Sequence, residues 1–169
     1  MAILRCTKKL LDELKVKPDD IEEQGQCISN WHANLIRVDR RKCILFTHDA
    51  TLFSIFLPGL KKPDFQRITD IFGQALFKSL IGESFSQTHV ELFLDDIRNI
   101  HFSKTNNRSV LGSMTDLTFQ IKFTISGYGG IGNTDIVQLN HDLNRVPMSA
   151  IKEIHSIREL RIFLDRLCR

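Results

Sequence analysis

The sequence predicts an α+β domain in which amphipathic helices cover one face of a mostly antiparallel sheet. Apolar, β-branched segments with short polar connections cluster in the first third of the chain, and one later segment alternates in the same way. In the remaining two thirds, apolar residues recur at spacings of three and four, which is typical of helices that face a core. The length of 169 residues, with 42% hydrophobic and 25% charged residues, fits one globular domain over residues 1–169.

The chain begins with a short apolar segment, which predicts a strand over Ile3–Thr7. A helix is expected over Thr7–Lys15, because threonine is a good N-cap and the leucines that follow lie on one helical face. Pro18 ends this helix, and the polar segment Asp19–Gln26 is expected to be a loop.

Three apolar segments then predict an antiparallel meander: Trp31–Val38, Cys43–Thr47 and Thr51–Leu57. Polar turns join them, and Pro58-Gly59 closes the last strand. The core side chains expected from this sheet are Leu35, Ile36, Ile44, Leu45, Phe46, Phe53, Ile55 and Phe56.

After Pro63 the apolar period changes from 2 to 3.6, which indicates a change from strands to helices. One further strand interrupts the helical part at Asn99–Lys104. The expected helices cover Asp64–Ile81, Thr88–Asp96 and Ser109–Ser126, then a segment from Ile136 to Val146 and a last one from Ile157 to Leu167.

The charge and the cysteines exclude several classes of protein. A net charge of +3 is short of the excess that marks a dedicated nucleic-acid binder. None of the four cysteines forms a C-x-x-C motif or a zinc-finger spacing, so no metal or cofactor is expected. The start has no long apolar region of a signal peptide, and the longest apolar run, Leu52–Leu60, is too short to span a bilayer. We therefore expect a reduced, cytoplasmic protein without a membrane partner.

The first candidate site is the junction between the later strand and the helix after it. Lys104, Asn106, Asn107, Arg108 and Ser109 combine two cations and small polar side chains at a helix start. Unpaired N–H groups and the positive end of the helix dipole make such a start a plausible site for a phosphate or another anion. The alternative is plain helix capping and turn formation by asparagine and serine.

The second candidate site lies in the strand Trp31–Val38. In an extended strand His32 and Asn34 share one face, where they would serve as a general base with its orienting amide or as ligand-binding groups. The alternative is a pair of hydrogen-bonded polar residues at the edge of a core. Trp31, on the other face, is expected to anchor the core rather than to stack on nucleic-acid bases.

Two further polar motifs are open to functional and structural interpretations. His48 and Asp49 fall in a predicted turn, where adjacent side chains point apart and Asp49 is explained as a turn residue. Within Asn140–Arg145, residues four positions apart share a helix face. Asn140 therefore lies beside Asn144, and His141 lies beside Arg145. This face is either a recognition surface or simply solvated.

Several strings resemble a family of uncharacterised bacterial proteins, a domain of unknown function. These are Leu4–Leu11, Trp31–Leu35, Arg41–Phe46 and Thr105–Met114, and the likeness extends to about Met148. The resemblance implies a bacterial, cytoplasmic source. Because members resemble regions associated with plasmid and mobile-element reading frames, it also implies work related to nucleic acids. It assigns no activity, cofactor or catalytic residue.

Three functions follow as hypotheses. The first is a small binding or regulatory domain for a phosphate-bearing partner such as nucleic acid. The second is a hydrolase or transferase acting on a phosphate-bearing small molecule. The third is a protein-interaction module, whose contact surface would come from those of the twelve phenylalanines that are exposed.

Overall fold

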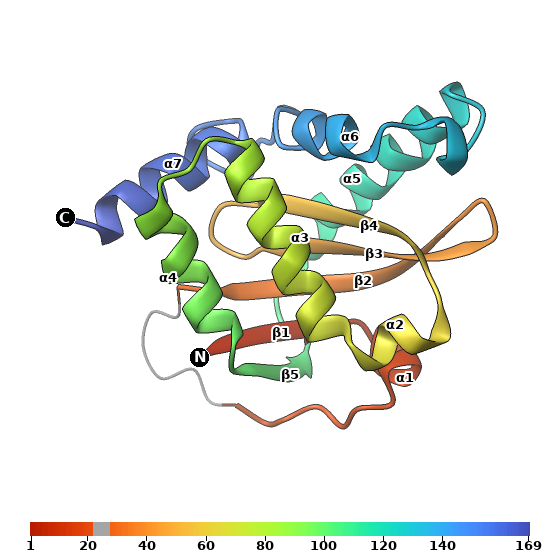
Figure 1. Cartoon of the computed structure of the whole chain (residues 1–169), viewed down its shortest axis with the longest axis horizontal. Helices are drawn as coiled ribbons and strands as arrows, with labels where there is room; N and C mark the ends of the chain where they lie inside the picture. The colour runs from red at the N-terminus through yellow and green to blue at the C-terminus, as the bar shows by residue number, and fades with distance from the viewer. Residues whose placement is uncertain (22–27) are drawn as a thin grey trace.

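The computed structural model describes residues 1–21 and 28–169, which fold around one five-stranded sheet (Figure 1). The strand order across the sheet is β4-β3-β2-β1-β5. The expected loop Asp19–Gln26 lies partly outside the described residues, as does Cys27. In chain order the elements are β1 (Ala2–Cys6), α1 (Lys8–Leu14), β2 (Asn30–Val38), β3 (Arg41–His48), β4 (Ser54–Leu60), α2 (Lys62–Gln66), α3 (Ile68–Gly82), α4 (Gln87–Ile97), β5 (Ile100–Lys104), α5 (Arg108–Gly127), a short 3-10 turn (Ile131–Asn133), α6 (Ile136–Leu143) and α7 (Ser156–Leu167).

The sheet is mixed. The antiparallel meander of β2, β3 and β4 is confirmed. The first strand, however, pairs in parallel with both of its neighbours, β2 and β5. Parallel pairing follows from the connections, because a helix separates β1 from β2 and β5 arrives only after the long helical segment that ends in α4. The α+β class is thus confirmed, with a sheet that gains one strand from far along the chain.

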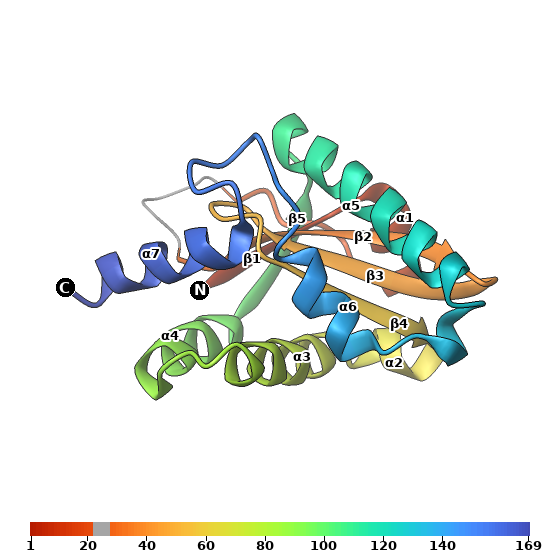
Figure 2. The same cartoon turned by 90° about the horizontal axis from the view of Figure 1, so that it is seen from above.

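Helices cover both faces of the sheet, so the expectation of one covered face is wrong. Figure 2 shows α3 and α4 on one side of the sheet and α5 on the other. The first core contains Trp31, Phe46 and Phe72 with the helices α1, α3, α4 and α7. The second core contains Leu45 and Phe56 with α5 and α6. The physical reason lies in β3, where Ile44 and Phe46 belong to the first core and Cys43 and Leu45 to the second. Apolar side chains on both faces of a strand are stable only when both faces of the sheet are covered.

Several boundaries differ from the expected ones for local reasons. The third strand of the meander starts at Ser54 instead of Thr51, because Leu52 adopts a left-handed conformation (φ 58°) in the hairpin loop. The expected helix Asp64–Ile81 is broken at Arg67, whose φ of −115° is not helical. The sixth helix ends at Leu143, so its expected continuation to Val146 is also wrong.

Two asparagine side chains, Asn140 within α6 and Asn144 at its C-cap, close the free edge of β4. Asn140 accepts a hydrogen bond from the Phe56 N–H (2.7 Å) and donates to the Phe56 carbonyl (3.1 Å). Asn144, one turn later, accepts from the Ser54 N–H (2.7 Å) and donates to the Ser54 carbonyl (2.9 Å). Each amide therefore pairs with the strand backbone as a neighbouring strand would. The asparagine face of α6 is neither solvated nor free for recognition.

Candidate functional site

Five buried polar side chains form a row across the whole sheet, one on each strand. Neighbours in the row are register partners, and all five alternate with residues of the first core, so they face α5 and α6. Each is at most 7% exposed. We call this set the polar row: Ser54, Thr47, His32, Arg5 and Ser103.

A polar row in this position needs partners, because a buried polar group without a hydrogen bond is destabilising. The hydroxyl groups of Thr47 and Ser54 bond to each other at 2.8 Å. The Ser103 hydroxyl donates to the Asp19 carbonyl at 3.1 Å. Apolar side chains would pack here without these requirements. Polar residues at positions where a core is otherwise apolar tend to mark functional sites, which makes the polar row a candidate functional site.

The charged centre of the row is a contact between His32, Asp49 and Arg5. The His32 Nδ1 lies 2.7 Å from one Asp49 carboxylate oxygen, and the Arg5 Nε lies 3.9 Å from the other. The side chains of His32 and Arg5 are buried, whereas that of Asp49 is 21% exposed. Asp49 therefore connects the buried row to solvent.

The other ring nitrogen of His32 faces the loop before α5. When the Nδ1–H donates to Asp49, Nε2 carries a lone pair, and the Asn106 backbone N–H points at it across 3.5 Å. This is a long hydrogen bond. It nevertheless shows that the structure brings the two candidate sites of the sequence together.

The junction at the start of α5 is capped as its sequence predicts. The Asn107 side chain accepts hydrogen bonds from the N–H groups of Ser109 (3.0 Å) and Val110 (3.2 Å). Lys104 and Arg108 are exposed, and neither forms an ion pair with any residue in the described part of the chain. The junction thus combines a structural cap with two available cations, so the capping and anion-site interpretations are compatible.

This junction lies where the chain leaves two parallel strands toward opposite faces. After β1 it enters α1, whose leucines Leu10 and Leu11 belong to the first core. After β5 it enters α5, which belongs to the second core. Cys6 and Lys104 are register partners, so the two exits are side by side. In open sheets, ligands bind outside the carboxyl ends of parallel strands at such a divergence.

Not every predicted site residue joins this centre. The Asn34 side chain accepts a hydrogen bond from the Thr7 hydroxyl (2.9 Å), at the start of α1. Trp31 faces the first core, is 1% exposed and packs edge-on against Phe72 and Phe93. Its prediction as a core anchor is confirmed, and its inclusion among the candidate binding residues is corrected by this burial.

Sequence reasoning missed the two charged partners of His32. The sequence does contain a signal for Arg5, because a single arginine inside the short apolar strand Ile3–Thr7 is stable only beside a buried anionic partner. Asp49 was interpreted as a turn residue, and nothing local indicates that its side chain turns back toward β2. Only the pairing of β2 with β3 places Asp49 beside His32.

His48, next to Asp49 in the chain, belongs to the opposite core. Its Nδ1 lies 2.8 Å from the Thr51 hydroxyl and its Nε2 lies 2.8 Å from the Ile28 carbonyl. The ring packs against Trp31, at 5.0 Å between centroids. Burial lowers the pKa of His48, which therefore stays neutral and donates from Nε2 to the carbonyl.

This burial predicts a loss of stability in mild acid. Below about pH 6.5 the unfolded chain binds a proton on His48 that the folded chain does not, so the free energy of unfolding falls with a limiting slope of about 1.4 kcal/mol per pH unit. Urea unfolding of the wild type and of His48→Gln between pH 7.5 and 5.5 checks this. The variant is expected to lose this part of the slope, and an identical slope in both proteins contradicts the assignment.

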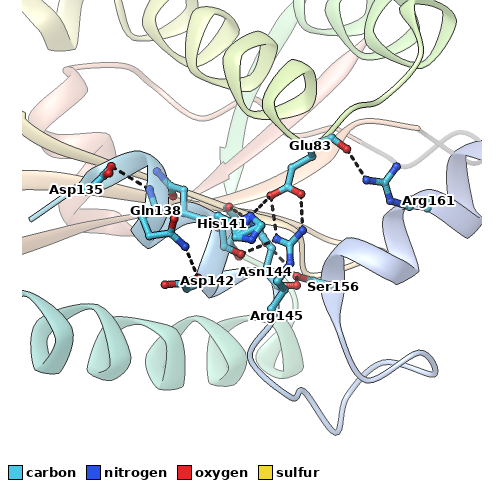
Figure 3. Close-up of polar contacts among 11 residues, drawn as sticks. Glu83, Asp135, Gln138, His141, Asp142, Asn144, Arg145, Ser156 and Arg161 are labelled. Atoms are coloured by element: carbon cyan, nitrogen blue, oxygen red, sulfur yellow. Dashed lines mark hydrogen bonds and ion pairs between the residues drawn. The ribbon is translucent and has the colours of Figure 1, made fainter.

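A second polar cluster joins α3 to α6 around a buried carboxylate (Figure 3). Glu83 accepts two hydrogen bonds from Arg145, at 3.0 and 2.7 Å, and lies 3.3 Å from the His141 Nδ1. The hydrogen bond to Glu83 raises the pKa of Arg145. His141 and Arg145 do share a helix face, as expected, and that face is bound to Glu83. Arg161 of α7 donates to the Glu83 carbonyl.

Two cysteines, Cys6 and Cys43, are buried and unreactive. Burial raises the pKa of the Cys6 thiol to about 12, and it also raises the pKa of Cys43, so both are inert apolar side chains. Over residues 1–21 and 28–169, no three His, Cys, Asp or Glu side chains gather in a way that could hold a metal ion. None of the helices in these segments has the length and hydrophobicity needed to cross a membrane.

Comparison with protein families decides where the chain belongs. The model of a family described as Domain of unknown function (DUF6933) matches residues 3–159. The chain is a member of this family. The DUF6933 match includes the polar row, the junction and the contact of Glu83 with His141 and Arg145. No curated protein and no solved structure was found to match. The resemblance to a domain of unknown function is confirmed, while a bacterial source and a link to mobile elements stay expectations.

Proposed function

We propose that this DUF6933 chain binds a phosphate-bearing partner, nucleic acid, at the surface formed by Lys104–Ser109 over the carboxyl ends of β1 and β5. One observation carries the proposal. Lys104 and Arg108, which have no ion-pair partner in the described chain, lie on either side of the start of the 20-residue helix α5. At this place the chain leaves the parallel strands β1 and β5 toward opposite faces of the sheet.

Neighbouring groups support an anionic partner. Lys8 and Lys9 are exposed at the start of α1, directly after the strand whose end pairs with Lys104. Thr7 does not cap α1, because its hydroxyl is bound to Asn34. Exposed lysines and arginines that face phosphates supply affinity without base specificity.

The contact between His32 and Asp49 supports a positioning function better than catalysis. A general base must come within hydrogen-bond reach of its substrate. The His32 side chain is fully buried, and its Nε2 faces the Asn106 N–H. His32 therefore holds the junction loop against the sheet, which leaves a hydrolase or transferase less well supported.

The proposal predicts binding of single-stranded oligonucleotides that weakens with salt. The double variant Lys104→Gln/Arg108→Gln is expected to bind at least about tenfold more weakly and to reduce the slope of log affinity against log salt concentration by about 1.4. Fluorescence anisotropy of labelled DNA and RNA, single- and double-stranded, measures both quantities.

The matched control removes the same charge elsewhere. Arg37→Gln/Arg40→Gln changes two exposed cations at the tip of the β2–β3 hairpin, which extends beyond β1 and β5 (Figure 1), and should bind like the wild type. Competition with ATP and with inorganic phosphate identifies a small-molecule site. The proposal fails if no oligonucleotide binds at low salt, if only ATP binds, or if the hairpin variant alone loses affinity.

Contact with a second copy of the chain is a second candidate function, because two phenylalanines on α5 face solvent. Phe119 and Phe123 are each 72% exposed, one turn apart on the side opposite the core. In an antiparallel pair of α5 helices centred on Phe119, Asp116 of one copy would oppose Lys122 of the other. Phe119→Ser/Phe123→Ser is expected to abolish concentration-dependent dimerisation in sedimentation velocity, and a wild type that is monomeric at all concentrations refutes this candidate.

A further inference from the structure

A cavity of about 270 Å³ lies at the β4 edge of the sheet, between α3 and α6. The junction proposed above lies after β5, at the other edge of the sheet, so the two places are separate. The floor of the cavity is formed by Phe53 and Ile55, which are buried in the first core.

The cavity exists because the two helices next to it belong to different cores. The third helix packs on one face of the sheet and α6 on the other. The asparagines of α6 bind the backbone of β4, which fixes this helix at the strand edge. Three of the α3 residues that line the gap, Ala75, Ser79 and Gly82, are small, so side chains do not fill it.

The cavity wall favours an apolar occupant. Ile136 and Val137 of α6 line the cavity together with Phe56 and Ala75, and Val137 is 81% exposed. Three of the polar side chains in the wall are already bound within the protein: Asn140 and Asn144 pair with β4, and Glu83 accepts from Arg145. Pockets for small molecules combine such apolar walls with a few polar groups at one side.

The charge around the opening favours an anionic head group. Lys78 lines the cavity, is exposed, and has no ion-pair partner within the described residues. Figure 3 shows Arg145 and Arg161 both turned toward Glu83, one to its carboxylate and one to its carbonyl. The bidentate contact with Arg145 neutralises the Glu83 carboxylate, so Lys78 remains as a cation at the cavity without an ion-pair partner in the described part of the chain.

We infer that this cavity binds a small amphipathic carboxylate, with its apolar body between α3 and α6 and its head group at Lys78. At about 30 Å³ for each water-sized group, the volume holds a body of about nine such groups. Octanoate is therefore a suitable probe. The apolar body is buried against Phe53 and Val137, and the carboxylate pairs with the free ammonium group.

Titration followed by two-dimensional 1H–15N NMR tests this site. Octanoate below its micellar concentration is expected to shift the amide signals of residues 55–57, 75–82 and 136–141 in a saturable way. Octanol, with the same apolar body and no charge, should bind at least about tenfold more weakly, which corresponds to the loss of one ion pair worth about 1.4 kcal/mol. Octylamine should not saturate these signals.

Two variants separate the cavity from its charge. Ala75→Phe places a ring in the cavity and should abolish the octanoate shifts. Lys78→Glu changes an exposed residue, leaves the fold intact, and should reverse the preference from octanoate to octylamine. Lys17→Glu, which changes an exposed lysine between α1 and β2, is the matched charge control and should bind octanoate like the wild type. Shifts that do not saturate, equal binding of octanoate and octylamine, or an unchanged response in Lys78→Glu would overturn the inference.

Discussion

Replacing Asp49 with alanine is expected to lower the free energy of unfolding by about 3 kcal/mol, because it removes the carboxylate that the buried Arg5 and His32 share. Breaking a buried ion pair from one side leaves the partner charge desolvated. Since Asp49 is 21% exposed, water can reach part of the gap, and the loss should stay at the low end of the range for buried pairs. Urea unfolding, with the m value checked against the wild type, measures the change.

A double-mutant cycle assigns this loss to the contact between Asp49 and His32. We expect Asp49→Ala and His32→Gln to be strongly non-additive, with a coupling energy above about 1 kcal/mol. Asp12→Ala, which removes an exposed carboxylate on α1, is the matched control and should change stability by less than about 0.5 kcal/mol. Additive effects of the two variants would mean that the 2.7 Å contact contributes nothing to the free energy of unfolding. Some other contact would then have to hold the junction loop against the sheet.

The second large effect is expected at Asn144, where alanine should cost about 4 kcal/mol. This side chain is 2% exposed and satisfies the N–H and the carbonyl of Ser54, and it also accepts from the Ser156 hydroxyl at 3.0 Å. Truncation leaves buried backbone groups without partners, and each such group costs about 1–3 kcal/mol. Thermal and urea unfolding of Asn144→Ala measure the loss.

Two variants on the same helix identify the cause. Asn144→Asp keeps the acceptor for the Ser54 N–H but loses the donor to its carbonyl, so it should still be destabilised. Gln138 is exposed and its side chain donates a hydrogen bond to Asp142, so Gln138→Ala should stay within about 0.5 kcal/mol of the wild type. An Asn144→Ala protein as stable as the Gln138→Ala protein would show that water replaces the amide at the strand edge.

Local patterns predicted the fold well where the partner of each segment is its neighbour in the chain. The meander of β2, β3 and β4 was predictable because short polar turns force adjacent strands to pair. The parallel position of β1 was not, because its partners are Asn30–Ala33 and residues 100–104, far along the chain. The one-face prediction failed because an apolar run such as Cys43–Thr47 indicates burial without saying from which side.

The candidate site shows the same division between local and distant contacts. The Asn107 cap lies within three residues of the groups it binds and was predictable. Asp49 lies 17 residues from His32, and Asn106 lies 74 residues from it, so their meeting depends on the assembled sheet. The two asparagines of α6 share a helix face in the sequence. Their binding to β4, 84 and 90 residues away, could not be inferred from that spacing.

The closed edges of the sheet have a consequence for how the protein behaves when it is crowded. An open edge strand offers its backbone to other chains and templates their addition. Here the backbone around Asp19 binds the Phe102 carbonyl of β5, and the two asparagines of α6 occupy the backbone of β4. A variant that frees β4 is therefore expected to remain folded at low concentration and to assemble into strand-linked aggregates at high concentration. Such a variant should therefore lose solubility before it loses its folded structure.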